Sequence, residues 1–378
     1  MKMNHSVRST SLLTRKKSLE PLHSFKKFPV FIGCTDQPRS KDIHANMNFD
    51  ICTETGLIQL RKLIPLDLIY KESHSEAVGG VWKEHHDQFS KFVGKYKLAK
   101  ILEIGGSNGV IAKKIIDKNP HTTITIVEPS PSIKSIGNIT VIKDYFNEKF
   151  RYKKQVDAII HSHVLEHLLD PSVSLKQIHD FLPMGAKQLF SIPNLEKWLS
   201  KKFPNTLNFE HTVFLSEYFT DCLLKKNGFK IIEKQYFGDH SIFYATEKVN
   251  HYSNLVIKNK YIRYKKMFND LVHEYENSAE IFNRKIDKFN GEVYLFGAHI
   301  FSQFLIYFGL DQKNIPAILD NAKSKENKRL YGTNLFVKNP NYLKNKKKVA
   351  VIVKAGSYTQ EIKNQLKKIN KRDRKSVV

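Results

Sequence analysis

Between residues 99 and 248 the sequence alternates between short apolar runs and segments with helical spacing, and this alternation constrains the fold more than any other feature. Apolar runs without polar alternation are typical of parallel strands that are buried on both faces. Strands and helices that follow one another in this way form a doubly wound α/β sheet. The predicted parallel strands cover residues 100–104, 123–127, 139–142, 156–160 and 187–192, with helices at 110–118 and 172–181.

The end of this region predicts a reversal of strand direction. Two apolar runs, at residues 229–236 and 240–246, are separated only by the turn Phe237-Gly238-Asp239. A connection this short joins antiparallel strands. We therefore expect an antiparallel hairpin to close the sheet.

A second, smaller α/β unit is expected after a long charged helical stretch at residues 250–288. It would contain strands at 292–296, 315–320 and 348–353, with a helix that begins at Phe301. The expected division is an N-terminal module (1–78), a central α/β domain (79–249), and a helical linker with a C-terminal Rossmann-like domain (250–378).

Composition limits the class of protein more than its function. The net charge of +25 attracts any anion, whether nucleic acid, anionic membrane or a phosphate-bearing substrate, and selects none of them. No apolar run is long enough for a membrane-spanning helix, and the first residues lack the apolar core of a signal peptide. Three widely spaced cysteines do not form a disulfide framework. We expect a reduced, cytoplasmic protein, and the sequence does not indicate an oligomeric state.

The strongest local signal follows the first predicted strand. Residues 102–109 read Leu-Glu-Ile-Gly-Gly-Ser-Asn-Gly, in which Gly105 and Gly109 permit a tight turn and let a ligand lie against the backbone. The spacing Glu-x-Gly-x-x-x-Gly differs from the Gly-x-Gly-x-x-Gly of dinucleotide-binding folds, which counts against NAD.

Polar side chains follow each of the next three predicted strands. Glu128 ends the second strand, where a carboxylate accepts hydrogen bonds from ribose hydroxyls. Asp144 and Tyr145 follow the third strand and could hold and stack an adenine. All of these positions lie at carboxyl ends of strands, where open α/β sheets bind ligands. The candidate cofactor-binding residues are Glu103, Gly105, Gly106, Asn108, Gly109, Glu128, Pro129, Asp144, Tyr145, Ser162, His163 and His167.

These four segments together resemble the class I methyltransferases. The resemblance covers about 150 residues, and its motifs are the glycine segment at residues 103–109, the acid Glu128 and the segment at 163–171. It implies S-adenosylmethionine as the cofactor and a seven-stranded sheet whose last strand runs antiparallel.

A narrower resemblance extends over the whole chain. Bacterial sugar C-methyltransferases, which modify nucleotide-linked deoxysugars, combine a cysteine-rich zinc module, a methyltransferase domain and a Rossmann-like C-terminal domain. Residues 52–60 resemble the end of the zinc module, and 297–298, 319–321 and 354–358 resemble the C-terminal domain. The family also implies that Tyr70 belongs to a flap near the methionyl end of the cofactor.

The chain departs from this family at the zinc module. Thr55 stands where the second cysteine of a pair would be, and a structural zinc site needs four such ligands. We therefore predict no metal site, with Cys34 and Cys52 as small buried side chains. His85 and His86 are adjacent on a predicted helix and point in different directions, so we expect a structural or substrate-lining role for them.

A second departure lies in the catalytic segment. The family carries a Tyr-x-Glu-His run, whereas this chain has Asn208-Phe209-Glu210-His211. Histidine titrates near neutral pH and suits a general base. The candidate catalytic residues are therefore His211, with Glu210 and Asn208 beside it. Loss of the tyrosine slightly favours methylation of oxygen over carbon, because a hydroxyl needs only one base and good alignment.

The expected substrate is a sugar, in nucleotide-linked form, that is used for surface polysaccharide. One alternative is a methyltransferase for RNA or another nucleic acid, which the basic charge favours. However, residues 161–171 lack the Asn/Asp-Pro-Pro-aromatic run of enzymes that methylate base amino groups. The other alternative is a non-catalytic protein that binds S-adenosylmethionine, and the retained acids at positions 103, 128 and 144 argue against it.

Overall fold

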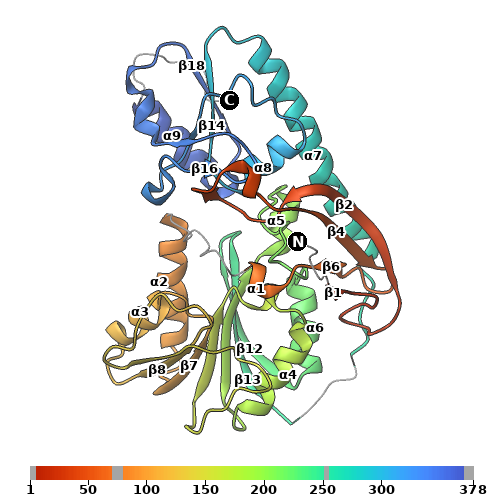
Figure 1. Cartoon of the computed structure of the whole chain (residues 1–378). Helices are drawn as coiled ribbons and strands as arrows, with labels where there is room; N and C mark the ends of the chain where they lie inside the picture. Colours follow the sequence, from red (N-terminus) through yellow and green to blue (C-terminus); the bar gives the residue numbers. More distant parts are fainter. Residues whose placement is uncertain (1–5, 70–79, 251–254, 370–378) are drawn as a thin grey trace.

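The computed structural model describes residues 6–69, 80–250 and 255–369. Its largest element is a mixed seven-stranded sheet with the strand order β12-β13-β11-β10-β7-β8-β9 (Figure 1). The strands are β7 (Lys100–Ile104), β8 (Thr123–Val127), β9 (Ile139–Ile142), β10 (Ala158–Ser162), β11 (Lys187–Pro193), β12 (Phe229–Phe237) and β13 (Ser241–Lys248). Strand β13 runs antiparallel to both of its neighbours, and the other pairs are parallel. The predicted fold is therefore confirmed, including the reversed last strand.

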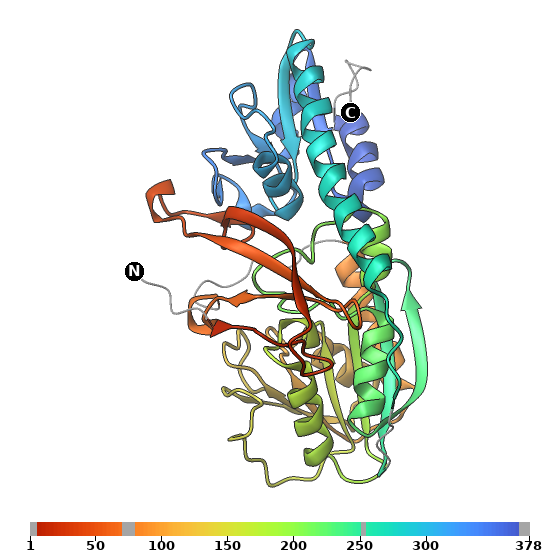
Figure 2. The ribbon, with the colours of Figure 1, turned by 90° about the vertical axis from the view of Figure 1, so that its right-hand side faces the viewer.

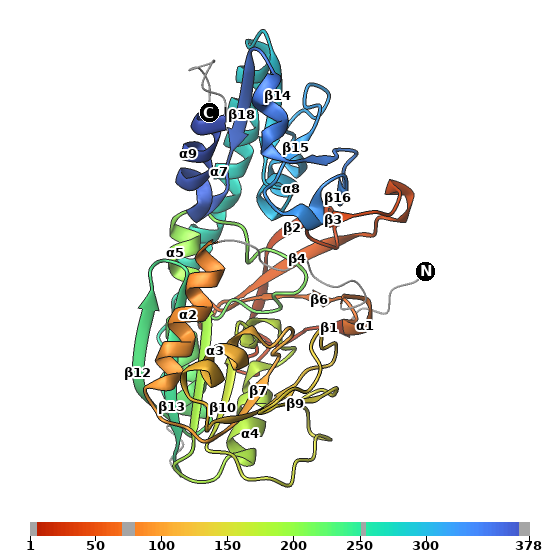
Figure 3. The same cartoon turned by 90° about the vertical axis from the view of Figure 1, so that its left-hand side faces the viewer.

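Helices cover both faces of this sheet (Figure 3). On one face, α2 (Gly80–Gly94) and α3 (Val110–Lys118) pack on it through Phe89, Phe92 and Ile115. The opposite face carries α4 (Pro171–Phe181) and α6 (Glu217–Lys226) (Figure 1). Short helices η2 (Leu165–His167) and α5 (Leu195–Ser200) follow β10 and β11 at the carboxyl edge of the sheet.

The N-terminal part forms a three-stranded antiparallel sheet beside the central domain (Figure 2). Its strands are β2 (Leu19–Pro29), β4 (His44–Cys52) and β5 (Ile58–Leu60), with the small elements β1 (Ser6–Val7), β3 (Cys34–Thr35), η1 (Arg39–Lys41), β6 (Lys62–Leu63) and α1 (Leu66–Ile69) around them. In the turn after β4, Thr55 Oγ1 accepts a hydrogen bond from the backbone N of Leu57 (3.2 Å). The Cys52 thiol lies 3.2 Å from Ser18 Oγ, whereas Cys34 lies on a different sheet. Hydrogen bonds therefore close the turn after β4.

The C-terminal part contains a parallel sheet of four strands in the order β17-β15-β14-β18. Its elements are α7 (Tyr261–Asp287), β14 (Glu292–Phe296), α8 (Ile300–Tyr307), β15 (Ile318–Leu319), η3 (Lys323–Lys325), β16 (Arg329–Leu330), β17 (Val337–Lys338), η4 (Pro340–Asn345), β18 (Val349–Val353), η5 (Gly356–Tyr358) and α9 (Thr359–Ile369). Strand β15 is shorter than predicted because Pro316 has no backbone N–H to donate to a neighbouring strand. Within the described ranges, no helix is long and apolar enough to cross a membrane.

A buried ion pair joins the first and last parts of the chain. Strand β3 pairs antiparallel with β16, and Arg329 of β16 contacts both carboxylate oxygens of Asp42 at 2.7 Å. The two side chains are only 5% and 1% exposed. Removal of one partner would leave the other charge buried without compensation, which costs far more than the loss of a surface pair.

Replacement Arg329→Leu is therefore expected to lower the free energy of unfolding by about 3–5 kcal/mol. The matched control is Lys328→Leu, because Lys328 pairs with an exposed Asp36 at 3.4 Å and such pairs contribute about 1 kcal/mol or less. Urea unfolding followed by circular dichroism measures the free energy of unfolding of both variants. Equal midpoints for the two variants would contradict the role assigned to the Arg329–Asp42 pair.

Candidate functional site

The glycine segment forms the turn from β7 into α3. Gly105 and Gly109 have φ angles of 74° and 70°, in the left-handed region that favours glycine. At Gly106 a Cβ would lie 2.7 Å from Ile126 Cγ2 and 3.0 Å from Cδ of Glu103, so this position also requires glycine. The backbone therefore forms a cradle that side chains would fill, at the carboxyl edge of the sheet.

Glu103 is a buried carboxyl group beneath this cradle. It is 2% exposed, and its Oε2 atom has no hydrogen-bond partner. Burial, and after it the nearby charge of Glu128, raises the pKa of Glu103 to about 8. An unpaired buried carboxyl oxygen at a ligand-binding edge indicates a group that a bound molecule completes.

Glu128 lies at the end of β8 and is oriented by the backbone around it. Its two carboxylate oxygens accept hydrogen bonds from Ser130 N (3.0 Å) and from Ser107 N in the glycine turn (3.2 Å). These contacts leave lone pairs for the hydroxyls of a ribose. Asn108 Oδ1 accepts from Val110 N at 3.2 Å, which helps to start α3.

The other predicted cofactor residues follow β8, β9 and β10. Pro129 is half-buried, and both Asp144 and Tyr145 are exposed, with Tyr145 N donating to the Asp144 carboxylate (2.7 Å). Ser162 Oγ lies 2.8 Å from Ser191 Oγ on the neighbouring strand. Tyr70 lies outside the described residues. The glycine cradle, the orphaned Glu103 oxygen and the oriented Glu128 together fit S-adenosylmethionine.

Three histidines surround a buried glutamate after β10. Glu166 is 3% exposed, and its Oε1 lies 3.3 Å from His163 Nδ1. Burial alone would raise the pKa of Glu166, but the contact with His163 and the charges of His163, His167 and His211 outweigh it and lower the pKa to about 2. The nearby histidines therefore favour the anionic form of Glu166, whereas its burial opposes that form.

The predicted catalytic turn packs against this anion. Asn208 Oδ1 accepts hydrogen bonds from the backbone N of Glu210 (2.8 Å) and of His211 (2.9 Å). Asn208 thus organises the turn and presents His211, whose ring lies 4.6 Å from that of His167. The turn continues along η2, because Thr212 N donates to Glu166 O (2.9 Å). Phe214 N donates to Ile58 O of β5 (2.9 Å), so the N-terminal sheet holds the same segment.

Glu210 lies close to His167, and its charge also acts on His211. Its Oε2 lies 4.0 Å from His167 Nδ1. Burial, then the charge of His167, lowers the pKa of His211 to about 4. His211 is consequently neutral at pH 7 and can accept a proton there.

The C-terminal part also reaches this site. His299 precedes α8 and is exposed to solvent. Desolvation lowers its pKa, and the charges that act on it belong to Lys325, Asp320 and, from the turn at residues 208–211, Glu210. His299 therefore lies within electrostatic range of that turn.

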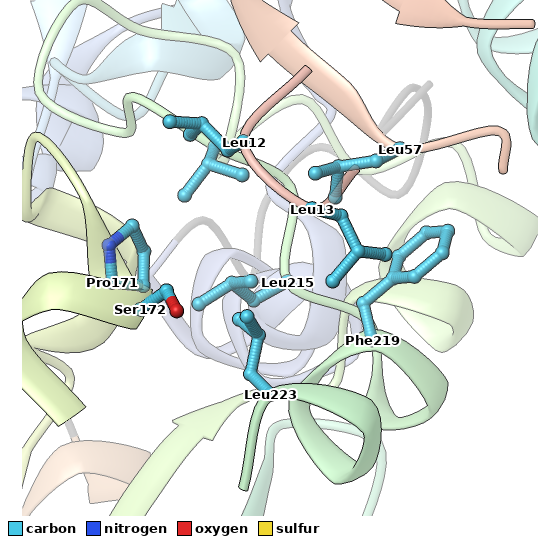
Figure 4. Close-up of a pocket in the computed structure, with 9 residues that line it drawn as sticks. Leu12, Leu13, Leu57, Pro171, Ser172, Leu215, Phe219 and Leu223 are labelled. Atoms are coloured by element: carbon cyan, nitrogen blue, oxygen red, sulfur yellow. The ribbon is translucent and has the colours of Figure 1, made fainter. Parts of the chain in front are cut away.

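Other side chains also gather here, among them Glu166 and members of the segments 82–86 and 238–241, which the sequence already places near the site. Glu166 was embedded in a segment chosen for its histidines, and its burial has no local signal. Trp82 of α2 packs against His240 of the β12–β13 turn, with ring centroids 4.7 Å apart. A small pocket elsewhere, lined by apolar residues such as Leu13, Leu215 and Phe219, contains none of these groups (Figure 4).

Comparison with known families agrees with this geometry. Residues 77–234 match a family model described as a methyltransferase domain, and residues 254–378 match one described as a C-methyltransferase C-terminal domain. The chain is a class I S-adenosylmethionine-dependent methyltransferase. A search of curated proteins found no match to it.

Solved structures similar to this methyltransferase include other methyltransferases. N-methyltransferase NodS from Bradyrhizobium japonicum WM9 is 15% identical, with 45% of this chain and 97% of that chain covered and a TM-score of 0.35. Human N-acetylserotonin methyltransferase in complex with SAM is 18% identical, with 45% and 53% covered and a TM-score of 0.39. Because both TM-scores are this low, the likeness supports no argument beyond the sheet topology described above.

Replacement Glu128→Ala is expected to weaken binding of S-adenosylhomocysteine at least about 100-fold, because it removes the acceptor for two charge-assisted hydrogen bonds. Isothermal calorimetry measures the affinity. Glu148→Ala is the matched control, since Glu148 is an exposed acid on the loop after β9. Unchanged affinity in the Glu128 variant would remove Glu128 from the cofactor site.

Stability of the methyltransferase is expected to fall below pH 6.5. His161 on β10 is 1% exposed, and burial lowers its pKa to about 3, so only the unfolded chain binds this proton between pH 6.5 and 3. Each such histidine costs about 1.4 kcal/mol of stability per pH unit in that window. Urea unfolding at several pH values between 6.5 and 4.5 gives the slope of the free energy of unfolding against pH. In His161→Phe this slope should be smaller than in the wild type by the contribution of about one bound proton. The exposed His121→Phe should leave the slope unchanged. Equal slopes in the two variants would contradict a neutral, buried His161.

Proposed function

We propose that this methyltransferase transfers a methyl group to a sugar that is linked to a nucleotide diphosphate. The observation that carries the proposal is that the charge of Glu210, in the turn at residues 208–211, acts on His299 of the C-terminal part. A substrate that extends over both parts would account for this arrangement. The match of residues 254–378 to a C-methyltransferase C-terminal domain also supports it.

The carboxyl edge of the C-terminal sheet suits an anionic group. Gly297, with a φ angle of 98°, turns the chain from β14 into α8. The start of a helix carries a partial positive charge that attracts phosphate. Lys325 lies nearby and pairs with Asp320 at 3.0 Å. The strongly basic chain would further raise the local concentration of a diphosphate.

On this proposal His211 is the general base. S-adenosylmethionine, when bound, supplies the methyl group on a sulfonium. Neutral His211 would take the proton from the acceptor hydroxyl as that oxygen attacks the methyl carbon. The imidazolium that forms would be compensated by the Glu166 anion, whose charge already acts on His211. Glu210 would orient His167, and Asn208 would hold the turn.

Replacement His211→Gln is expected to lower turnover by about 10²–10⁴-fold without weakening cofactor binding. Turnover is measured with radiolabelled S-adenosylmethionine over a panel of nucleotide sugars, and binding is measured with S-adenosylhomocysteine. His273→Gln is the matched control, because His273 is exposed on α7. Normal turnover in His211→Gln would exclude His211 as the base, and no activity on any nucleotide sugar in the wild type would overturn the substrate proposal.

A second candidate is methylation of carbon rather than oxygen, which the C-terminal family match favours. We favour methylation of oxygen because the related family carries tyrosine at the position of Asn208. The Asn208 side chain instead accepts hydrogen bonds from the backbone of its own turn. The product distinguishes the two, since a methyl ether and a carbon-bound methyl have different proton NMR shifts.

A further inference from the structure

Three histidines from three separate elements meet beside the cofactor loop. They are His85 on α2, His163 after β10 and His240 in the β12–β13 turn, and each offers a ring nitrogen within 4.8 Å of those of the other two. Their ring centroids are 5.2 Å (85–163), 5.6 Å (85–240) and 5.7 Å (163–240) apart. Three imidazoles bound to one tetrahedral zinc, at a Zn–N distance of about 2.0–2.1 Å, have ring centroids roughly 5 Å apart.

Packing of the His85 ring does not account for its two buried ring nitrogens. Its side chain has no exposed surface, and neither of its ring nitrogens has a hydrogen-bond partner. A buried polar group without a partner is costly, and a native fold normally satisfies it with protein, water or an ion. A cation between the three rings would satisfy it.

His163 is oriented as a metal ligand would be. Its Nδ1 faces Glu166 Oε1 at 3.3 Å, which turns Nε2 away from the glutamate. Metal-binding histidines commonly have a carboxylate at the other ring nitrogen. His163 also has a φ angle of 53°, a strained conformation for a residue with a side chain, and such strain is concentrated at functional sites.

We propose that His85, His163 and His240 bind one zinc ion. Imidazole nitrogen is a ligand for zinc, whereas magnesium and calcium prefer oxygen. Three protein ligands leave a fourth position for another ligand, as in catalytic zinc sites. Ser241 Oγ lies 2.9 Å from His163 Nε2 and 2.6 Å from His240 Nδ1, so a bound ion would replace the hydrogen bond to His163 Nε2. Trp82 packs edge-on against the rings of His85, His163 and His240, at centroid distances of 5.2, 5.0 and 4.7 Å. The nitrogens would need to close by about 1 Å to reach zinc-binding distances.

The ion would lie next to the methyl-transfer site. Val164, which follows His163, comes so close to the glycine turn that a Cβ on Gly105 would lie 2.9 Å from its Cγ2. The open coordination position could therefore bind an oxygen of the acceptor. This last role rests on the proposed function, whereas zinc binding does not depend on it.

Zinc binding is tested on the full chain after removal of metal with a chelator. Titration with Zn²⁺ against a chromophoric competitor, and with Co²⁺ followed by its visible d–d absorption, should show one equivalent per chain in a tetrahedral site. His85→Ala and His240→Ala should each weaken binding at least about 100-fold. His86→Ala is the matched control, because His86 adjoins His85 on α2 but does not belong to the three. Circular dichroism and S-adenosylhomocysteine binding verify that each variant is folded.

The absence of stoichiometric binding, or equal affinity in His85→Ala, His240→Ala and His86→Ala, would overturn the proposal. So would loss of binding only in His211→Ala, because this would assign the ion to a second cluster formed by Glu166, His167 and His211. A chain that binds zinc at the three histidines but methylates no nucleotide sugar would contradict the proposed function and leave the zinc site standing.

Discussion

The Glu166 carboxylate is a negative charge in a position that water does not reach, and the catalytic region is arranged around it. A buried anion is stable only when donors or cations surround it. His163 contacts Glu166 directly, and ring nitrogens of His167 and His211 lie within 4.8 Å of its carboxylate. Glu166 thus belongs to the surroundings of both groups of histidines, so a proton or an ion bound at one group changes the electrostatic field at the other.

The site also depends on contacts between parts of the chain that are distant in sequence. The catalytic turn is held by Asn208 within itself, by η2 through Thr212, and by β5 of the N-terminal sheet through Phe214. The N-terminal part is in turn fixed to the C-terminal part by the buried Arg329–Asp42 pair. The position of His299 relative to the turn therefore depends on an ion pair that does not belong to the site.

The cofactor half of the site could be predicted from the sequence, whereas the acceptor half could be predicted only in part. Glu103 and Glu128 lie at the ends of adjacent strands, and parallel strands bring their carboxyl ends to one edge. Glu210 lies in the same turn as His211, and its Oε2 is 4.0 Å from His167 Nδ1, a contact that no local pattern in the sequence indicates. Asn208 was selected as a candidate catalytic residue, and its hydrogen bonds give it a role in the backbone turn. Domain boundaries at residues 78 and 249 and the individual site residues stay predictions.

Local patterns in the sequence determined the strands, the antiparallel hairpin and the acidic edge, because apolar periodicity and glycine spacing act over a few residues. Only the tertiary structure decided which histidines meet. His85, His163 and His240 lie on a helix, a loop and a hairpin turn, and no spacing rule connects them. Their approach results from the packing of α2 against the sheet through Phe89 and Phe243, and from the reversed strand β13 that brings the hairpin turn to the carboxyl edge. The sequence determines the chemistry of each side chain, but the packing of distant elements determines which side chains it contacts.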